Sequence, residues 1–137
     1  MSFQDMAEAG RAFEGSRELL VESGRLVTSV PHPCTDTPYR EWERDEAGER
    51  VALKIDRYFE TGPGKLLWSM DRLSYHWQVP MWRRTLSEWS ELIKEARFVI
   101  RQLHEPRPTP EQIEKQPALE DASRIPMFLI FDLVRID

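Results

Sequence analysis

The chain has 137 residues, 40% of them hydrophobic and 31% charged, which is the length and composition of one globular domain rather than of a disordered chain. Its formal net charge of -5 argues against a nucleic-acid-binding protein, because such proteins normally carry a basic face. The sequence contains one cysteine, no signal-peptide pattern and no apolar run long enough to span a membrane, so we expect a cytoplasmic protein that does not bind membranes.

The first half of the chain predicts one helix and three strands. Apolar and small residues recur at helical spacing over residues 5–21. Residues 25–30 predict a short strand that Pro31 ends, because proline has no N–H to donate within a sheet. Residues 50–60 and 73–81 alternate between apolar and polar side chains, which predicts two half-buried strands. We expect these two strands to form one antiparallel ribbon, with a solvated loop at residues 41–50 and a turn at residues 61–64.

The second half predicts a helix and two further strands. The sequence TLSE from Thr85 is a capping-box pattern, which predicts the start of a helix, and residues 98–103 predict a strand. Four prolines interrupt the connection that follows, where we expect one or two helical turns near residues 111–115. Residues 126–135 are mostly apolar, as in a central strand buried on both faces. The order predicts an α/β fold, a single sheet covered by helices.

Four stretches carry a resemblance to a known family: SFQDM at residues 2–6, SGRLVTSVPHPC at 23–34, the run 75–112 that begins YHWQVPMWRR, and PMFLIFDLVR at 126–135. Together they resemble the C-terminal half of class I S-adenosylmethionine-dependent methyltransferases, in particular the small-molecule type near ubiquinone and menaquinone biosynthesis. The resemblance implies a partial Rossmann-like sheet with the equivalents of strands five, seven and six. It also implies that residues 1–137 form a single truncated methyltransferase-like domain, with residues 35–84 as an inserted lid and ribbon.

The resemblance also bears on the cofactor. Family members hold S-adenosylmethionine on a glycine-rich loop after strand one, whereas the six glycines of this sequence are scattered. We therefore expect no cofactor on the isolated chain, and S-adenosylmethionine only if a partner completes the domain. The family usually has glycines in the turns before strands five and six, where this sequence has Ser23 and Arg97 among its turn residues.

Two functions follow from this resemblance. The first is the acceptor-side half of a small-molecule methyltransferase that is not active alone. The alternative is a non-catalytic truncated homologue that acts as a homodimeric interaction or small-molecule-binding module. In both, the strand at residues 25–30 would leave one edge unpaired, so we expect a second copy or a complementary chain to bind there.

His32 and Cys34 lie two residues apart at the end of a predicted strand, between prolines. A metal site needs about four ligands at recognisable spacing, and the other histidines, His76 and His104, are far away in the sequence. A Cys–His nucleophile pair is no better supported, since this spacing does not by itself bring the two side chains together. A rigid strand exit is the simplest interpretation of Cys34. The resemblance implies a further role for His32, at the strand end where ligands bind in open α/β sheets.

The remaining candidates are substrate-binding residues implied by the resemblance. Tyr75, His76 and Trp82 belong to the predicted ribbon, which in the related enzymes folds over the acceptor, although an alternating aromatic stripe more often belongs to a core. By alternation His76 would be more exposed than its neighbours. Gln4 matches the loop after strand four. Arg83 precedes a helix cap, where a charged side chain is more often solvated than bound to an acidic substrate.

Overall fold

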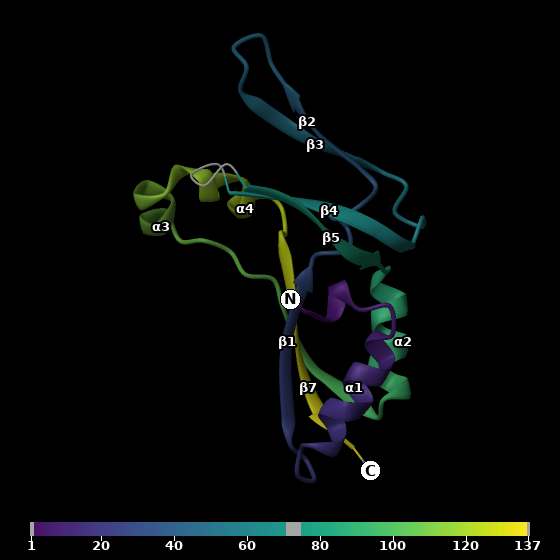
Figure 1. Ribbon diagram of the computed structural model, residues 1–137. Helices are drawn as coiled ribbons and strands as arrows, with labels where there is room; N and C mark the ends of the chain where they lie inside the picture. Colours follow the sequence, from purple (N-terminus) through teal and green to yellow (C-terminus); the bar gives the residue numbers. More distant parts are fainter. Residues whose placement is uncertain (1, 71–74, 137) are drawn as a thin grey trace.

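The centre of the fold is a three-stranded sheet in the order β1-β7-β6, with both neighbouring pairs antiparallel (Figure 1). The computed structural model describes residues 2–70 and 75–136. Its elements in chain order are η1 (Ser2–Asp5), α1 (Ala9–Glu18), β1 (Arg25–Pro31), β2 (Tyr39–Arg44), β3 (Arg50–Asp56), β4 (Gly62–Met70), β5 (Tyr75–Arg83), α2 (Leu86–Glu95), β6 (Phe98–His104), α3 (Pro110–Lys115), η3 (Pro117–Leu119), α4 (Glu120–Arg124) and β7 (Phe128–Arg135). No helix among the described residues is long and apolar enough to cross a membrane.

One face of the sheet is covered by α1 and α2 (Figure 1). Phe13 of α1 lies between them and the sheet, with the rings of Trp89 and Phe98 edge-on to it at centroid distances of 6.4 Å. The predicted helix over residues 5–21 is shorter in the structure, because η1 forms separately and stacks Phe3 on Phe13 at 4.4 Å. This stacking holds the N-terminal segment against the core.

The predicted capping box of α2 is present. Glu88 N donates to Thr85 Oγ1 at 3.1 Å, and Thr85 N donates to the Glu88 carboxylate at 2.6 Å. The next free helix donor, Leu86 N, is satisfied by Tyr58 Oη at 2.9 Å. Three of the N–H groups at this end therefore have partners, one of them supplied by the segment between β3 and β4.

The single predicted ribbon is wrong, because the structure has two. β2 pairs with β3 and β4 pairs with β5, so the strand at residues 50–56 does not meet the one at 75–83. The expected turn at residues 61–64 instead begins β4, and the expected loop at 41–50 contains most of β2. Its true turn is built by Asp45, whose carboxylate accepts from Ala47 N and Glu49 N, and by Gly48 at a φ of 84°.

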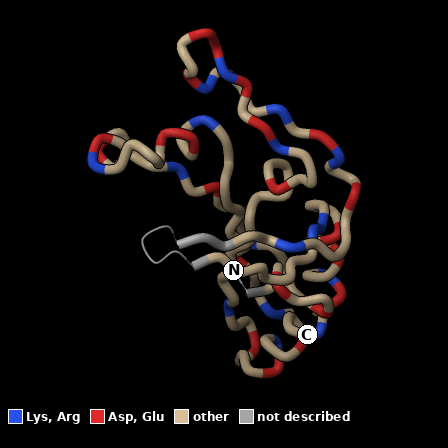
Figure 2. Tube along the Cα trace, turned by 45° about the horizontal axis from the view of Figure 1, so that its top comes forward, with Lys and Arg blue, Asp and Glu red and all other residues tan. Residues whose placement is uncertain are grey.

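The composition of the β2–β3 hairpin explains why the sequence predicts a loop where β2 lies. Acidic and basic residues mix along it (Figure 2), as they do when both faces of a ribbon meet water. Val51 and Ile55 are exposed, and of the predicted half-buried face of this strand only Leu53, paired with Trp42, is partly buried. On the other face of the hairpin, Lys54 and Glu43 form a cross-strand ion pair at 3.3 Å.

The connection between β6 and β7 contains the predicted helical turns as α3, and in addition η3 and α4. Arg124 of α4 donates to the backbone oxygens of Arg50 and Val51 at 2.7 and 2.9 Å and lies over the ring of Trp42. Asp121 forms an ion pair with Arg50. These contacts attach α4 to the β2–β3 hairpin.

Two turns place a residue other than glycine in a backbone conformation that favours glycine. Ser23, two residues before β1, and Arg97, immediately before β6, have φ values of 58° and 57°. A side chain in this region is strained, because Cβ approaches the backbone. These are the two turns in which the resembling family usually has glycine.

The sheet face opposite the helices carries a cluster of charges. Asp132 of β7 accepts from Arg25 of β1 at 2.7 and 3.1 Å and from Arg101 of β6, so one carboxylate joins all three strands. Hydrogen bonds from Arg101 and Arg25 lower the pKa of Asp132 to about 2. Beside this cluster Val27 is 60% exposed.

The low pKa of Asp132 predicts a pH-dependent contribution to stability. A depressed folded-state pKa stabilises the protein above the ordinary value of 3.8, and this stabilisation disappears as the pH falls through about 2. We expect Asp132→Asn to lower the unfolding midpoint in urea at neutral pH, and the gap from wild type to shrink between pH 4 and pH 2. Glu46→Gln, in the exposed β2–β3 turn, is the control. A gap that stays constant over this range would contradict the assignment.

Candidate functional site

The turn after β1 is held by the carbonyl of His32, which accepts from Thr35 N and Asp36 N at 3.0 and 2.9 Å. The His32 ring is 7% exposed, and its two nitrogens have different neighbours. Nδ1 accepts from Cys34 N at 3.2 Å, whereas Nε2 lies 3.0 Å from a carboxylate oxygen of Glu105, just after β6. Because Nδ1 accepts, the proton of the neutral ring belongs on Nε2, facing the carboxylate.

The same turn also holds the start of β7. His32 N donates to Met127 O at 3.0 Å, and Thr35 Oγ1 donates to Pro126 O at 2.7 Å. The side chain of His32 therefore contacts the segment leaving β6, and its backbone contacts the segment entering β7. This turn therefore joins three segments that are far apart in the sequence.

Cys34 is exposed and contacts the His32 ring through its backbone N–H. Its thiol makes no hydrogen bond to the ring. Among the described residues no group of three or more histidine, cysteine, aspartate or glutamate side chains is arranged to hold a metal ion. The geometry of the turn is therefore that of an anchored strand exit.

Two of the predicted substrate-binding residues, Gln4 and Trp82, lie beside this turn. Gln4 of η1 is buried, and its Nε2 donates to Asp36 Oδ2 at 2.9 Å. Both residues line a small cavity together with Asp36, Pro33 and Arg83. The cavity measures about 10 Å³, which is the room of about one water molecule, so these residues meet without enclosing a ligand.

Asp36 and Arg83 give this cluster its charge. Burial raises the pKa of Asp36 above its ordinary value, against the opposing effects of Arg83, Arg40 and the hydrogen bond from Gln4. Arg83 Nε is buried and has no hydrogen-bond partner among the described residues. A buried donor without an acceptor is unusual in proteins, so this N–H is available to another group.

The neighbouring Arg84 has a different role from Arg83. It donates to Met6 O and Ala7 O, each at 2.8 Å, and its guanidinium lies over the ring of Trp89. Burial lowers the pKa of Arg84. Arg84 thus fastens the segment after η1 to α2, a contact that the sequence does not reveal.

The other ribbon candidates do not join this cluster. His76 is exposed, as its place in the alternation predicts, and it is not among the residues that line the Gln4–Trp82 cavity. Tyr75 begins β5, but its side chain lies outside the described part of the chain. Sequence reasoning gave no role to Asp36 or Glu105. Their only signal was their position just after predicted strands.

Comparison with known proteins gives a consistent result at the level of structure. No protein-family model matches the chain, and no curated protein matches it. A solved S-adenosylmethionine-dependent methyltransferase from Mesorhizobium loti is similar over 98% of this chain, with a TM-score of 0.78 and 28% identity. A structure assigned as the same kind of enzyme in Listeria monocytogenes is similar over 100% of it, with a TM-score of 0.78 and 25% identity.

This chain adopts part of a methyltransferase fold. It spans 59% of the length of each of these two solved chains. The coarse expectation from the sequence, an α/β fold similar to these methyltransferases, is confirmed. Within this fold the turn after β1 lies at the carboxyl end of a strand, which is where ligands bind in open α/β sheets.

The anchoring role of His32 in this methyltransferase fold can be tested by substitution. We expect His32→Ala to cost roughly 1–3 kcal/mol in the free energy of unfolding, since it leaves Cys34 N and Glu105 without a buried partner. Hydrogen exchange should accelerate at the amides of Cys34 and His32. His76→Ala, which removes an exposed histidine, should change neither. Unchanged exchange in His32→Ala would show that the ring does not anchor the turn.

Proposed function

We propose that this chain forms the acceptor-side part of an S-adenosylmethionine-dependent methyltransferase that acts on a small molecule. The observation that carries the proposal is the similarity to the Mesorhizobium loti methyltransferase over 98% of the chain. The small-molecule type near ubiquinone and menaquinone biosynthesis is part of the proposal, on the sequence resemblance of residues 75–112 alone. The 137 residues would then act as one unit of a larger methyltransferase domain.

In this proposal β1, β7 and β6 are the equivalents of family strands five, seven and six. The observed order β1-β7-β6 supports the assignment, as does the position of β7 between two antiparallel neighbours. The two hairpins between β1 and α2 would be the lid over the acceptor. Gln4, His32 and Trp82 then lie at the rim of the acceptor site, at the carboxyl end of β1.

Methyl transfer asks mainly that the acceptor be held in line with the methyl donor and away from water. Trp82 would supply an apolar wall, and the free Arg83 Nε–H a hydrogen bond to an oxygen of the acceptor. Gln4 Nε2 donates a hydrogen bond to Oδ2 of Asp36. Oδ1 is left to accept a hydrogen bond from an acceptor hydroxyl or amine.

The cofactor would be held by polypeptide that is not in this sequence, either continuous with it or separate. The glycines here are scattered, and the Gln4–Trp82 cavity has room only for about one water. β1 has one neighbour among the described strands, β7, so its outer edge is available to a further strand. Residues added there would bring a cofactor site close to the Gln4–Trp82 cluster.

Calorimetry with S-adenosylmethionine tests this proposal. We expect no binding to the 137-residue chain, and binding to a chimera in which the unmatched part of the Mesorhizobium loti enzyme is joined to it. The same part of that enzyme without this chain is the control, and circular dichroism checks that each protein is folded. Binding by the isolated chain, or no binding by a folded chimera, would overturn the proposal.

A second candidate is a non-catalytic module that associates with itself. The observation that favours it is exposed apolar surface on the sheet face opposite the helices, where Val27, Val99 and Phe128 are 60%, 48% and 41% exposed. Together with the unpaired edge of β1, this face is suited to binding a second copy of the chain. Such a dimer would need no cofactor.

Sedimentation analysis separates this candidate from the first. A homodimeric module should sediment as a dimer at high concentration, and Val27→Lys should shift it to the monomer, because a charge on an edge strand opposes pairing. Leu19→Lys, which replaces a residue 89% exposed at the end of α1, is the matched control. A wild-type chain that stays monomeric at every concentration would rule out self-association.

A further inference from the structure

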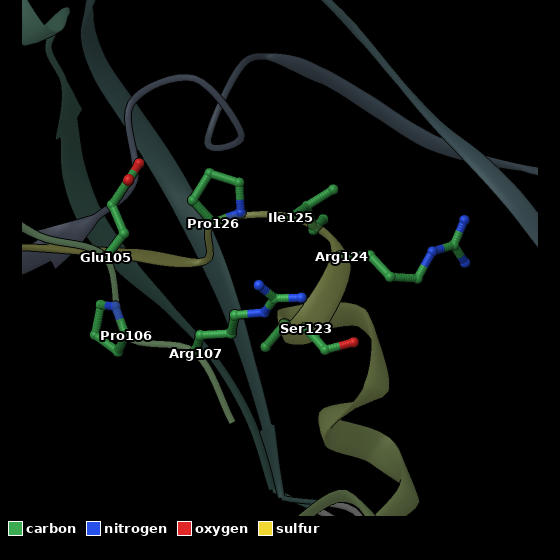
Figure 3. Close-up of a pocket in the computed structure, with 8 residues that line it drawn as sticks. Glu105, Pro106, Arg107, Ser123, Arg124, Ile125 and Pro126 are labelled. Carbon is green, nitrogen blue, oxygen red and sulfur yellow. The ribbon is translucent and has the colours of Figure 1, made fainter. Parts of the chain in front are cut away.

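A second hollow is lined by Glu105, the partner of His32, and lies between the segment leaving β6 and the junction of α4 with β7 (Figure 3). Its volume of about 330 Å³ is in the range of small-molecule sites. The lining residues are Glu105, Pro106, Arg107, Ala122, Ser123, Arg124, Ile125 and Pro126. Prolines and Ile125 supply the apolar part of this lining, and the charged groups are few.

Both walls of this hollow are fixed by the turn after β1. Glu105 on the first wall contacts His32 Nε2, and Pro126 on the second accepts from Thr35 Oγ1. Pro106 and Pro126 further restrict the backbone of each wall, because the proline ring fixes φ. The hollow is therefore largely formed before any ligand binds, which reduces the entropy lost on binding.

The charged residues of the lining differ in whether they already have a hydrogen-bond or ion-pair partner. Arg124 is directed away from the hollow, toward the backbone oxygens of Arg50 and Val51. Glu105 is in contact with His32. Arg107 has no hydrogen bond or ion pair with any residue that the structure describes, and its guanidinium extends across the hollow toward Ser123 (Figure 3).

Most arginines of the described chain have a protein partner, which makes Arg107 distinctive. Arg25 and Arg101 bind Asp132, Arg57 binds Glu60, and Arg84 binds backbone oxygens. In the described chain the side chains of Arg83 and Arg97 also lack a hydrogen bond, but Arg83 lies beside the carboxylate of Asp36, and the hollow that Arg97 lines carries the side chains of Glu14, Glu18 and Glu95. Arg107 therefore has a guanidinium without a partner among the described residues, and it lines a hollow whose single carboxylate, that of Glu105, already contacts His32.

We propose that this hollow binds a small organic acid, with its carboxylate on Arg107. The planar guanidinium offers parallel N–H donors that match the two oxygens of a carboxylate. The body of the ligand lies against Pro106, Ile125 and Pro126. Ser123 Oγ donates to Glu120 O at 2.7 Å, so its lone pairs accept a hydroxyl or amine proton of the ligand.

The charge of the hollow favours a single carboxylate over a phosphate. One arginine balances one negative charge, and the neighbouring carboxylate of Glu105 repels a dianion. The site is independent of the proposed methyl transfer, since every group that forms it is in this chain. Its test therefore needs neither S-adenosylmethionine nor a partner.

The test is a titration of the ¹⁵N-labelled 137-residue chain with benzoate, with benzamide as the neutral ligand of the same shape. We expect benzoate to shift the amides of Ala122, Ser123 and Ile125 and the side-chain Nε–H of Arg107, and benzamide to bind at least tenfold more weakly, because a charge-assisted hydrogen bond is lost. Arg107→Gln should weaken benzoate binding by a similar factor. Arg107→Lys keeps the positive charge but loses the parallel N–H donors of the guanidinium, so its affinity for benzoate should lie between those of the wild type and Arg107→Gln.

Arg11→Gln is the matched control, because it removes the same charge from an exposed position on α1. It should leave benzoate binding unchanged. The proposal is overturned if benzoate shifts no amide of this lining, or if benzamide binds as well as benzoate. It is also overturned if Arg107→Gln and Arg11→Gln lower the affinity equally, since this would show only general attraction to positive charge.

Discussion

The contacts of His32 are the constraint on which both hollows of this protein depend. One buried ring joins the turn after β1 to Glu105, while the backbone of the same residue pairs with Met127 at the start of β7. Removing water from an imidazole is unfavourable unless its nitrogens find partners, so the turn is stable only when all three segments are in place. The Gln4–Trp82 cluster includes residues of this turn, and the Arg107 hollow is lined by Glu105 and Pro126, which contact it.

The sheet itself is asymmetric. Its helix-covered face is held by aromatic packing around Phe13, whereas the opposite face is held by Asp132 between Arg25 and Arg101. A buried carboxylate with two guanidinium partners fixes the register of three strands, because a shift by one residue would move the charge to the apolar face. The same open face leaves apolar side chains exposed, and β1 has only one neighbour, β7, among the described strands. Both features are consistent with a unit that meets further polypeptide in the methyltransferase fold.

The two clusters of polar side chains, at Asp36 with Arg83 and at Arg107, are suited to different kinds of binding. At the carboxyl end of β1, Asp36 and the free Nε–H of Arg83 lie together with room for about one water, which suits the rim of a site that other residues complete. The hollow at Arg107 is complete within the chain and is proposed to hold a small organic acid. Experiments on one cluster therefore do not depend on the other.

Elements with local sequence signals could be predicted without the structure. The capping box at Thr85, the strands ending near Pro31 and Arg135 and the helical turns near Glu111 were all predicted, because each depends on residues within one or two turns of chain. Local patterns did not reveal which strands pair. The sequence predicts the strand that contains β3 but predicts a loop where most of β2 lies, because β2 is largely exposed and its charged residues follow the pattern of a solvated segment. The contact of His32 with Glu105, and the lack of a partner for Arg107 among the described residues, could be seen only in the folded chain, because they depend on the spatial arrangement of residues tens of positions apart.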